Sequence, residues 1–230
     1  MKYNVVPAFP SPIIQVYVEE DTSELFGHNK SVAEEVFEYK NKKYTNGDEH
    51  GHLKKSYNTY NFIGGSLESQ RVLEKYPKTK EILLNKYNFV AEEILGYKKR
   101  DYAITTSWFT LSNKGERVLP HIHKNSFWSC VYYYQEEYPK GTGGILFDNP
   151  NTLLFDYGYS DNDIATHNHI NSRACIIPPS PNLLLIFPSY LQHQIMKHNN
   201  DVPRSSLAFN LIPLGSWGDG DSYLDSSWFQ

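Results

Sequence analysis

The second half of the chain consists of short apolar runs. Between residues 102 and 214, each run of leucine, β-branched or aromatic residues is closed by Gly, Pro, Asn or Asp, which is the pattern of strands joined by turns. Strands are expected at residues 103–111, 117–120, 127–134, 144–147, 174–177, 183–187, 192–196 and 205–212. Some eight strands within about 110 residues predict a β-sandwich or jelly roll.

The first part of the chain carries fewer strand signals. A β-type run at residues 13–18 follows two prolines, which favours a strand at a sheet edge. Ser31 and Glu34 form a capping-box pattern beside apolar residues at helical spacing, so a short helix is expected there. Residues 41–60 are polar and predict a loop.

Two further helices are expected before the main run of strands. Ser66 is placed to cap a helix that continues to about Tyr76 and ends at Pro77. Residues 79–95 carry their apolar side chains along one stripe, and Gly96 provides a C-terminal stop. Such a stripe predicts a helix that covers one face of a sheet.

Length and patterning predict one domain. The 230 residues are 40% hydrophobic, which suffices for one packed core, and no linker or internal repeat divides them. We expect helical support and an edge strand in residues 1–100, a β core in 101–214 and a C-terminal tail in 215–230. The expected fold class is therefore α+β, mainly β, with N-terminal helices buttressing one sheet.

Charge and composition exclude several classes of protein. The formal net charge of -4 argues against general affinity for nucleic acid, because Lys and Arg are not in excess. The N-terminus lacks a signal-peptide pattern and no stretch is long and apolar enough to cross a membrane, so a soluble, cytoplasmic protein is expected. Cys130 and Cys175 are too few for a disulfide scaffold, and we expect two buried thiols.

Candidate metal chemistry begins with His121 and His123, which stand just before the apolar strand expected at 127–134. Side chains two apart on an extended chain point to the same face. Both imidazoles can therefore reach one metal ion. His193, in a later apolar strand, is a candidate third ligand.

A candidate anion site follows in the sequence. Arg204 and Ser206 stand two residues apart, so a guanidinium and a hydroxyl share one face of a strand and suit capture of a carboxylate. If residues 197–202 form a hairpin, Arg204 lies opposite His193 on the neighbouring strand. That register predicts a cation one strand away from the metal.

Two other histidine pairs occur in expected loops. His50 and His52 have no apolar strand after them to fix their geometry, and we interpret them as solvated side chains. His167 and His169 are interpreted as a solvated or substrate-side feature, because loop ligands lack rigid support.

Several segments together carry a resemblance to a known family. They are Phe9–Pro12, Ser107-Trp108, His121-x-His123, Cys130–Tyr134, Gly143–Pro150, Phe187–Ser189 with His193, and Arg204-x-Ser206 with Leu207–Asn210. In this order and spacing they resemble the iron(II)/2-oxoglutarate-dependent oxygenase superfamily, with prolyl hydroxylases as more distant relatives. The resemblance is weak before residue 100 and good after it.

The resemblance implies a double-stranded β-helix, a cupin-like jelly roll, that holds Fe(II) in its mouth. His121 and His193 match the first and the distal histidine ligands of that superfamily. His123 stands where the superfamily usually has a carboxylate. Three assignments stay open: all three histidines bind the metal, or Asn125 takes the place of the carboxylate beside His123 and His193, or Asp148 supplies it.

The resemblance also implies a cosubstrate site. Arg204 and Ser206 match the pair that binds the far carboxylate of 2-oxoglutarate, and Tyr133 or Tyr132 matches a tyrosine that supports it. The implied activity is hydroxylation of a C–H bond in a small-molecule or peptidyl substrate with release of succinate and CO2. Ascorbate is a candidate reductant.

Two other functions are compatible with the same residues. One is a cupin-like metal enzyme that uses three histidines without 2-oxoglutarate, and the other is a non-catalytic β-sandwich that binds a partner through aromatic residues. The loop at 149–173 and the tail at 215–230 are expected to set the substrate, with the tail's aromatic residues over the mouth or packed outside. Exposed aromatic edges are compatible with a homodimer.

Overall fold

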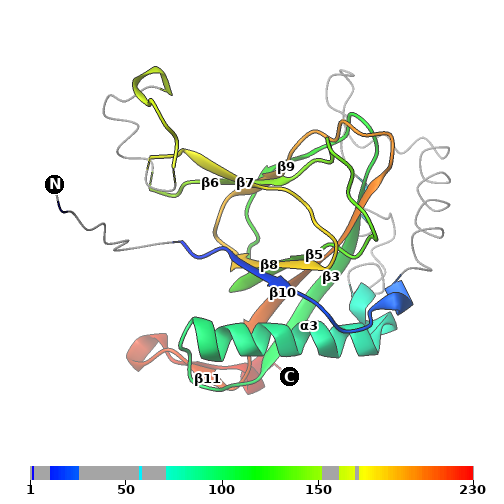
Figure 1. Ribbon diagram of the computed structural model, residues 1–230. Coiled ribbons are helices and arrows are strands. Elements are labelled where there is room, and N and C mark those ends of the chain that lie inside the picture. The colour runs from blue at the N-terminus through cyan, green and yellow to red at the C-terminus, as the bar shows by residue number, and fades with distance from the viewer. Residues whose placement is uncertain are drawn as a thin grey trace, which may run out of the picture.

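Two antiparallel β-sheets face each other across an apolar interior in this computed structural model (Figure 1). It describes residue 2 and residues 11–25, 57–58, 71–151, 161–168 and 171–229. Within these, the major sheet has the strand order β1-β8-β5-β10-β3-β2 and the minor sheet has the order β4-β9-β6-β7. The strands are β1 (Ile14–Tyr17), β2 (Tyr57–Asn58), β3 (Tyr102–Ser112), β4 (Val118–His121), β5 (Trp128–Tyr132), β6 (Ile145–Asp148), β7 (Ala174–Ile177), β8 (Leu183–Pro188), β9 (His193–Ile195), β10 (Arg204–Pro213), β11 (Ser216–Trp217) and β12 (Leu224–Asp225).

The chain passes back and forth between the two sheets from β3 onward. The strands β3, β5, β8 and β10 belong to the major sheet, while β4, β6, β7 and β9 belong to the minor sheet. This alternation is the winding of a jelly roll. It confirms the mainly β fold class, and the strands expected from residue 103 onward are β3 to β10 with shifted ends.

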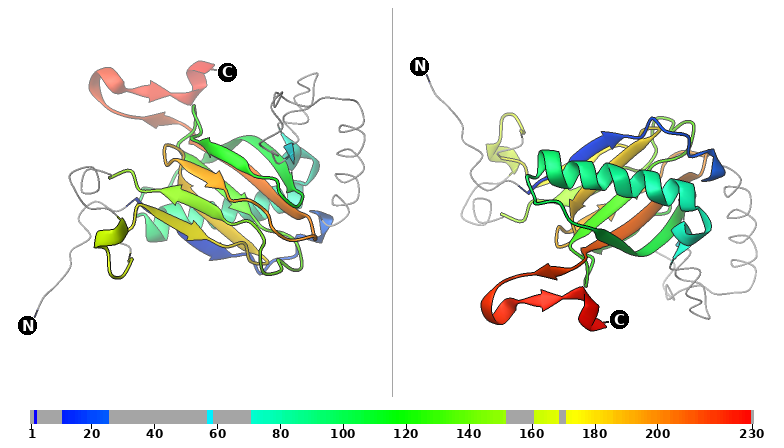
Figure 2. Two further views of the ribbon diagram at one scale, coloured as in Figure 1. Left: turned by 90° about the horizontal axis from the view of Figure 1, so that it is seen from above. Right: turned by 90° about the horizontal axis from the view of Figure 1, so that it is seen from below.

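The helix expected at 79–95 is confirmed and covers the major sheet. It is α3 (Pro77–Phe89), continued by a π-helical turn, η4 (Val90–Ile94), and it lies across the strands on the outer face (Figure 2). Gly96 follows with a φ of 70°, the left-handed conformation of a helix stop.

A helical segment ends before Pro77, as expected, but the next helix begins at Pro77 itself and not at residue 79. The described residues before Pro77 form a 3-10 helix, η3 (Val72–Lys75), and Pro77 is the first residue of α3. A proline suits that position because its fixed φ is helical and the first turn has no use for its missing N–H. The helix expected around Ser31 lies outside the described residues.

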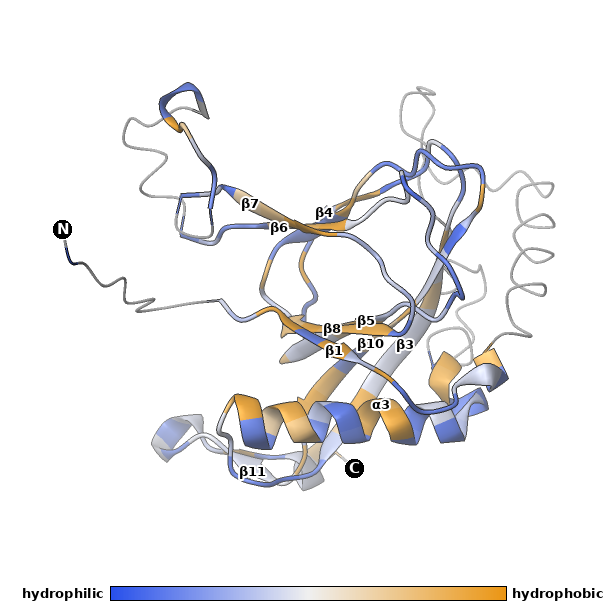
Figure 3. Cartoon of the chain, viewed as in Figure 1, coloured by the Kyte–Doolittle hydropathy of each residue, from blue (hydrophilic) through white to orange (hydrophobic). Residues whose placement is uncertain are grey.

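Burial divides the apolar residues into two layers. One layer fills the space between α3 and the major sheet, and there the ring of Tyr87 packs edge-on against Tyr102 with centroids 4.7 Å apart. The other layer lies between the sheets and includes Val131 and Phe187. The strands carry most of the hydrophobic residues, whereas the loops between them are largely hydrophilic (Figure 3).

Segments around this framework are short. The 3-10 helices are η1 (Ser23–Leu25), η5 (Asp161–Asp163), η6 (Gly220–Ser222) and η7 (Ser226–Phe229). The tail forms a small hairpin of β11 with β12, which lies on the α3 side of the major sheet (Figure 1). Its Trp217 packs against Phe127, with ring centroids 6.1 Å apart. This placement is the outside packing, the second of the two arrangements considered for the tail.

The two cysteines differ in exposure. Both are free thiols, but Cys175 is exposed, so the expectation of two buried thiols is wrong for this residue. Its strand, β7, is the outermost strand of the minor sheet and pairs only on one side within the described residues. Burial raises the pKa of the Cys130 thiol. None of the described helices has the length and apolar character needed to cross a bilayer.

Replacing Leu83 by Ala will lower the free energy of unfolding by about 2–5 kcal/mol, because Leu83 is fully buried between α3 and the major sheet. Urea denaturation followed by tryptophan fluorescence measures this loss. Ile94→Ala on the same helical segment is the matched control, since Ile94 is 54% exposed and its loss should change stability by less than about 1 kcal/mol. Equal losses in the two variants would contradict the assigned helix face.

Candidate metal centre

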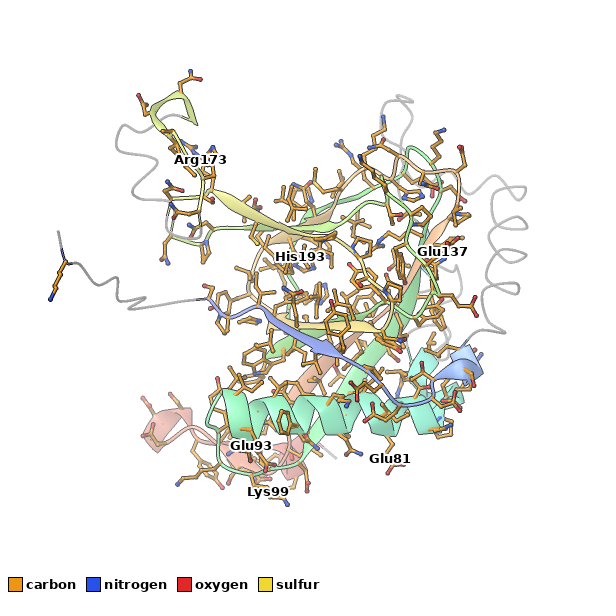
Figure 4. All side chains as sticks on the ribbon, viewed as in Figure 1. Glu81, Glu93, Lys99, Glu137, Arg173 and His193 are labelled. Atoms are coloured by element: carbon orange, nitrogen blue, oxygen red, sulfur yellow. The ribbon has the colours of Figure 1, made fainter. Side chains whose placement is uncertain are left out.

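Three histidines converge between the two sheets. His121 ends β4 and His193 begins β9, and these residues are direct partners in the antiparallel pairing of the two strands. His123 follows two residues after β4. One nitrogen from each of the three rings lies within 4.8 Å of the others. The ring of His193 occupies the space between the sheets (Figure 4), where it packs on Phe187.

Hydrogen bonds at Nδ1 orient two of the three imidazoles. His121 Nδ1 lies 2.8 Å from the carbonyl oxygen of Leu119, and His193 Nδ1 lies 2.9 Å from that of Leu191. A carbonyl only accepts, so these Nδ1 atoms donate and the Nε2 lone pairs remain available. This arrangement, with one ring nitrogen donating to an oxygen and the other bare, is the usual state of a metal-binding histidine.

Burial keeps two of the rings neutral. It lowers the pKa of His193 to about 3, helped by the neighbouring His121. It also lowers the pKa of His123 to about 4, although the hydrogen bond of this ring to Asn210 Oδ1 acts in the opposite direction. Neutral imidazole is the form that binds metal, so both rings are ready to do so near neutral pH.

A cavity of ≈ 280 Å³ opens beside the histidines. Its walls are mostly apolar side chains, together with two hydroxyl-bearing residues, one amide and one lysine. Besides the histidines, the lining residues are Trp108, Val118, Ile122, Val131, Ile145, Ile195 and Ala208, with Thr110, Ser206, Asn210 and Lys124. The three histidines therefore face an apolar pocket with a few polar groups, as in a small-molecule site.

Arg204 is a buried cation with unused donors. The residue is 1% exposed, its Nη2 donates to Tyr133 Oη at 3.2 Å, and its guanidinium lies 5.2 Å from the centre of the Tyr133 ring. Its Nε and Nη1 are buried without a hydrogen-bond partner among the described residues. Leaving charged donors unpaired in the interior costs free energy. The arrangement therefore fits an anion.

The predicted place of Arg204 in the sheet is wrong. The strands β9 and β10 are not paired: β9 lies between β4 and β6, and β10 lies between β5 and β3. The segment between them crosses from one sheet to the other and is held there by backbone bonds from His198 to Glu116 and from Asn199 to Gly141. Arg204 therefore belongs to the opposite sheet from His193. It shares a face of β10 with Ser206, which lines the cavity.

Of the two alternative tyrosines, Tyr133 is the one that lies near Arg204. Tyr133 faces the interior between the sheets and contacts Arg204. Tyr132 points to the other side of β5, into the layer under α3, where its hydroxyl lies 2.8 Å from Thr22 Oγ1. Neighbouring residues of a strand face opposite ways, and this alternation separates them.

Asp148 and Asn125 are the alternatives for the group that takes the usual carboxylate's place. Asp148 alternates along β6 with Phe147, whose ring packs near His193, and its carboxylate accepts a hydrogen bond from Gln192 at 2.7 Å. Asn125 is a left-handed turn residue with a φ of 61°. Among the described histidines, cysteines and carboxylates, the group that converges here is His121, His123 and His193.

Asn210 is a site residue that the sequence reasoning missed. Its Oδ1 lies 2.7 Å from His123 Nδ1. The sequence contains a signal for it, because Arg204, Ser206 and Asn210 all stand at even-numbered positions of β10. Residues separated by an even number of positions share one face of a strand. The other histidine pairs fall elsewhere: His167 is exposed, and His50, His52 and His169 lie outside the described residues.

Solved structures with this fold cover most of the chain. The alpha ketoglutarate dependent epimerase SnoN from nogalamycin biosynthesis aligns over 91% of this chain and 82% of its own, with 11% identity and a TM-score of 0.53. HygX from Streptomyces hygroscopicus, with iron bound, aligns over 88% and 82%, with 7% identity and a TM-score of 0.51. At these identities the likeness shows the fold alone, and it confirms the double-stranded β-helix.

A third solved structure aligns with a smaller part of this chain. A 2OG-Fe(II) oxygenase family oxidoreductase from Burkholderia pseudomallei aligns over 59% of this chain and 58% of its own, less than two thirds of its length, with 12% identity and a TM-score of 0.41. That score is too low to support an argument.

Sequence comparison finds one family that matches. No curated protein sequence matches this chain. The family model described as "Putative 2OG-Fe(II) oxygenase" matches residues 106–210, and this segment contains the three histidines, Arg204 and Asn210. The resemblance noted in the sequence is thereby confirmed for residues 106–210, which match the 2OG-Fe(II) oxygenase family model.

Proposed function

We propose that this chain is an Fe(II)- and 2-oxoglutarate-dependent dioxygenase that hydroxylates a C–H bond of its substrate. The observation that carries the proposal is the pairing of two features around one interior. Three imidazole nitrogens converge on one side, and a buried guanidinium with two unpartnered nitrogens lies on the other sheet. A metal and an anionic cosubstrate would satisfy both.

His121, His123 and His193 would hold the metal through their Nε2 atoms. Imidazole suits Fe(II), and three protein ligands leave positions for a cosubstrate and for O2. Because all three ligands are neutral, the metal keeps its full charge of +2 and attracts an anion more strongly than a site with a carboxylate would. Related structures support this choice, since SnoN has been solved with Fe3+ and alpha ketoglutarate and HygX with nickel and 2-oxoglutarate.

Arg204, Ser206 and Tyr133 would hold the far carboxylate of 2-oxoglutarate. The unpartnered Nε and Nη1 of Arg204 supply charged donors, and the Ser206 side chain lines the cavity on the same face of β10. Tyr133 fixes the guanidinium through its hydroxyl and its ring. A buried dianion requires such a fixed cation.

The apolar walls of the cavity favour the exclusion of water from the site. Val131, Ile145 and Ile195 line the cavity from three strands, so a bound cosubstrate displaces water from the metal's surroundings and strengthens electrostatic contacts there. When bound, Fe(II) and 2-oxoglutarate supply the oxidising chemistry in which O2 converts 2-oxoglutarate to succinate and CO2 and adds an oxygen atom to a C–H bond.

A cupin-like metal enzyme that acts without 2-oxoglutarate is the second candidate. The observation in its favour is the all-histidine donor set, because the converging group among the described residues contains no carboxylate. Arg204 separates the two functions. A 2-oxoglutarate enzyme depends on its guanidinium, whereas the second candidate has no use for a dianion site.

The first prediction from this proposal concerns the metal. Anaerobic titration will show one Co(II) or Fe(II) bound per chain, and His193→Gln will weaken binding by more than about 100-fold, since a direct ligand should cost more than an outer-shell partner. His167→Gln is the control, because His167 is exposed and lies away from the group. A wild-type protein that binds no divalent metal would sink the proposal.

The second prediction concerns the cosubstrate. With Fe(II), ascorbate and 2-oxoglutarate the protein will form succinate, and Arg204→Lys will raise the KM for 2-oxoglutarate by roughly 10- to 100-fold, because hydrogen bonds to charged groups contribute about 1.5–3 kcal/mol. Lysine keeps the charge but not the forked donors. Arg100→Lys, at an arginine that donates to the Ser216 carbonyl, controls for loss of a guanidinium elsewhere.

Thermal unfolding of both arginine variants checks that they remain folded. If a folded wild-type protein with bound Fe(II) neither binds nor consumes 2-oxoglutarate, the dioxygenase is excluded and the cupin-like candidate replaces it. If turnover is unchanged in the folded Arg204→Lys variant, the assigned cosubstrate pocket is wrong.

A further inference from the structure

The hydrogen bond to Asn210 sets His123 apart from the two other histidines. His121 and His193 each donate to the backbone carbonyl two residues earlier, so their own strands orient them. The Nδ1 of His123 instead meets two side chains, Asn210 Oδ1 at 2.7 Å and Ser129 Oγ at 2.8 Å. Of the three rings, His123 is the one whose orientation depends on side chains from other strands.

Asn210 is itself held at both ends of its amide. Its Nδ2 donates to Thr106 Oγ1 at 2.9 Å, and its Oδ1 accepts from Ser129 Oγ at 2.9 Å. Asn210 is 9% exposed and Ser129 is fully buried, so water does not compete freely for these bonds. The amide oxygen is therefore presented to His123.

A chain of hydrogen-bonded hydroxyl groups leads to Asn210 Oδ1 and favours its role as an acceptor. Ser126 Oγ donates to Ser189 Oγ at 2.8 Å, which leaves the Ser189 hydrogen free to point at Ser129 Oγ, also 2.8 Å away. Ser129 can then donate to Asn210. All hydrogens along this chain of hydroxyl groups are directed toward the amide oxygen, and an oxygen that only accepts requires a hydrogen on His123 Nδ1.

These hydrogen bonds matter because residue 123 is a histidine and not a carboxylate. A carboxylate, the usual group at this position according to the family resemblance, can offer either oxygen to a metal. An imidazole binds only through the nitrogen that carries no proton. Replacing the carboxylate by histidine therefore adds a requirement, which is control of the tautomer.

We infer that Asn210 is a positioning residue that fixes His123 in the tautomer protonated on Nδ1 and thereby completes the three-histidine metal site. The inference rests on the proposed function, because it takes His123 as a metal ligand. Asn210 acts through His123 and does not itself contact the metal. Ser129 assists by donating to the same Asn210 Oδ1, which holds the amide oxygen in place.

Metal affinity of matched variants tests the inference. Asn210→Leu removes the acceptor at similar volume and should weaken Co(II) binding about 10- to 100-fold, the usual effect of losing an outer-shell partner. Asn210→Asp keeps an acceptor oxygen and should restore affinity to within a few-fold of wild type. Equal affinity of wild type and the Leu variant would overturn the inference while leaving the proposed function intact.

A second background separates positioning from simple structural support. In a His123→Asp protein, Asn210→Leu should change Co(II) affinity by less than about 3-fold, because a carboxylate has no tautomer to fix and is too short to need the amide. A loss as large as in the wild-type background would mean that Asn210 only stabilises the local fold, and this result would overturn the inference.

The tautomer can be read without any metal. Long-range 1H–15N correlation spectra of the metal-free, 15N-labelled protein should show His123 protonated on Nδ1, and Asn210→Leu should convert it to a mixture. A wild-type His123 protonated on Nε2 overturns the inference. If wild type binds no Co(II) at all, the proposed function fails, and this spectrum still decides the role of Asn210.

Discussion

The antiparallel pairing of β4 with β9 is the contact on which the candidate site depends. It sets His121 directly opposite His193 and so brings together two imidazoles that are far apart in the sequence. Short strands pair in one register only when their flanks agree, and here β6 fixes β9 from its other side. The third ring needs only to follow His121 by two residues. The convergence of the three histidines is therefore a consequence of minor-sheet geometry.

The major sheet contributes the opposite half of the chemistry. Arg204, Ser206 and Asn210 occupy one face of β10, the strand that makes the most extensive pairing in the sheet. A rigid central strand is a good carrier for groups whose positions matter to within a fraction of an ångström. The two sheets thus have different tasks, since one supplies the candidate metal ligands and the other supplies the cation and the amide that we infer to orient the third of them.

The sequence allowed much of this to be predicted, and the failures have physical causes. Short apolar runs and the turn residues between them located the strands, and spacing alone suggested that His121 and His123 act together. The place of Arg204 could not be obtained in the same way, because residues 197–202 look like a local hairpin, whereas bonds to distant loops direct them across to the other sheet. The start of α3 was placed two residues too late, because a proline suits the first turn of a helix as well as the gap between two helices.

Strand β5 has apolar side chains on both faces, so its own hydrophobic pattern does not fix its register in the sheet. Contacts at its ends have to do so. Ser129, Val131 and Tyr133 face the interior between the two sheets, while Cys130 and Tyr132 face α3. Sliding by one residue would exchange one tyrosine for another at little loss of packing, yet it would bring a thiol beside His123 in place of a hydroxyl. Backbone bonds at the two ends of the strand, from Ser189 to Phe127 and from Tyr133 to Leu183, oppose that slip. Insertions or deletions near these ends should thus be tolerated by folding more readily than by function.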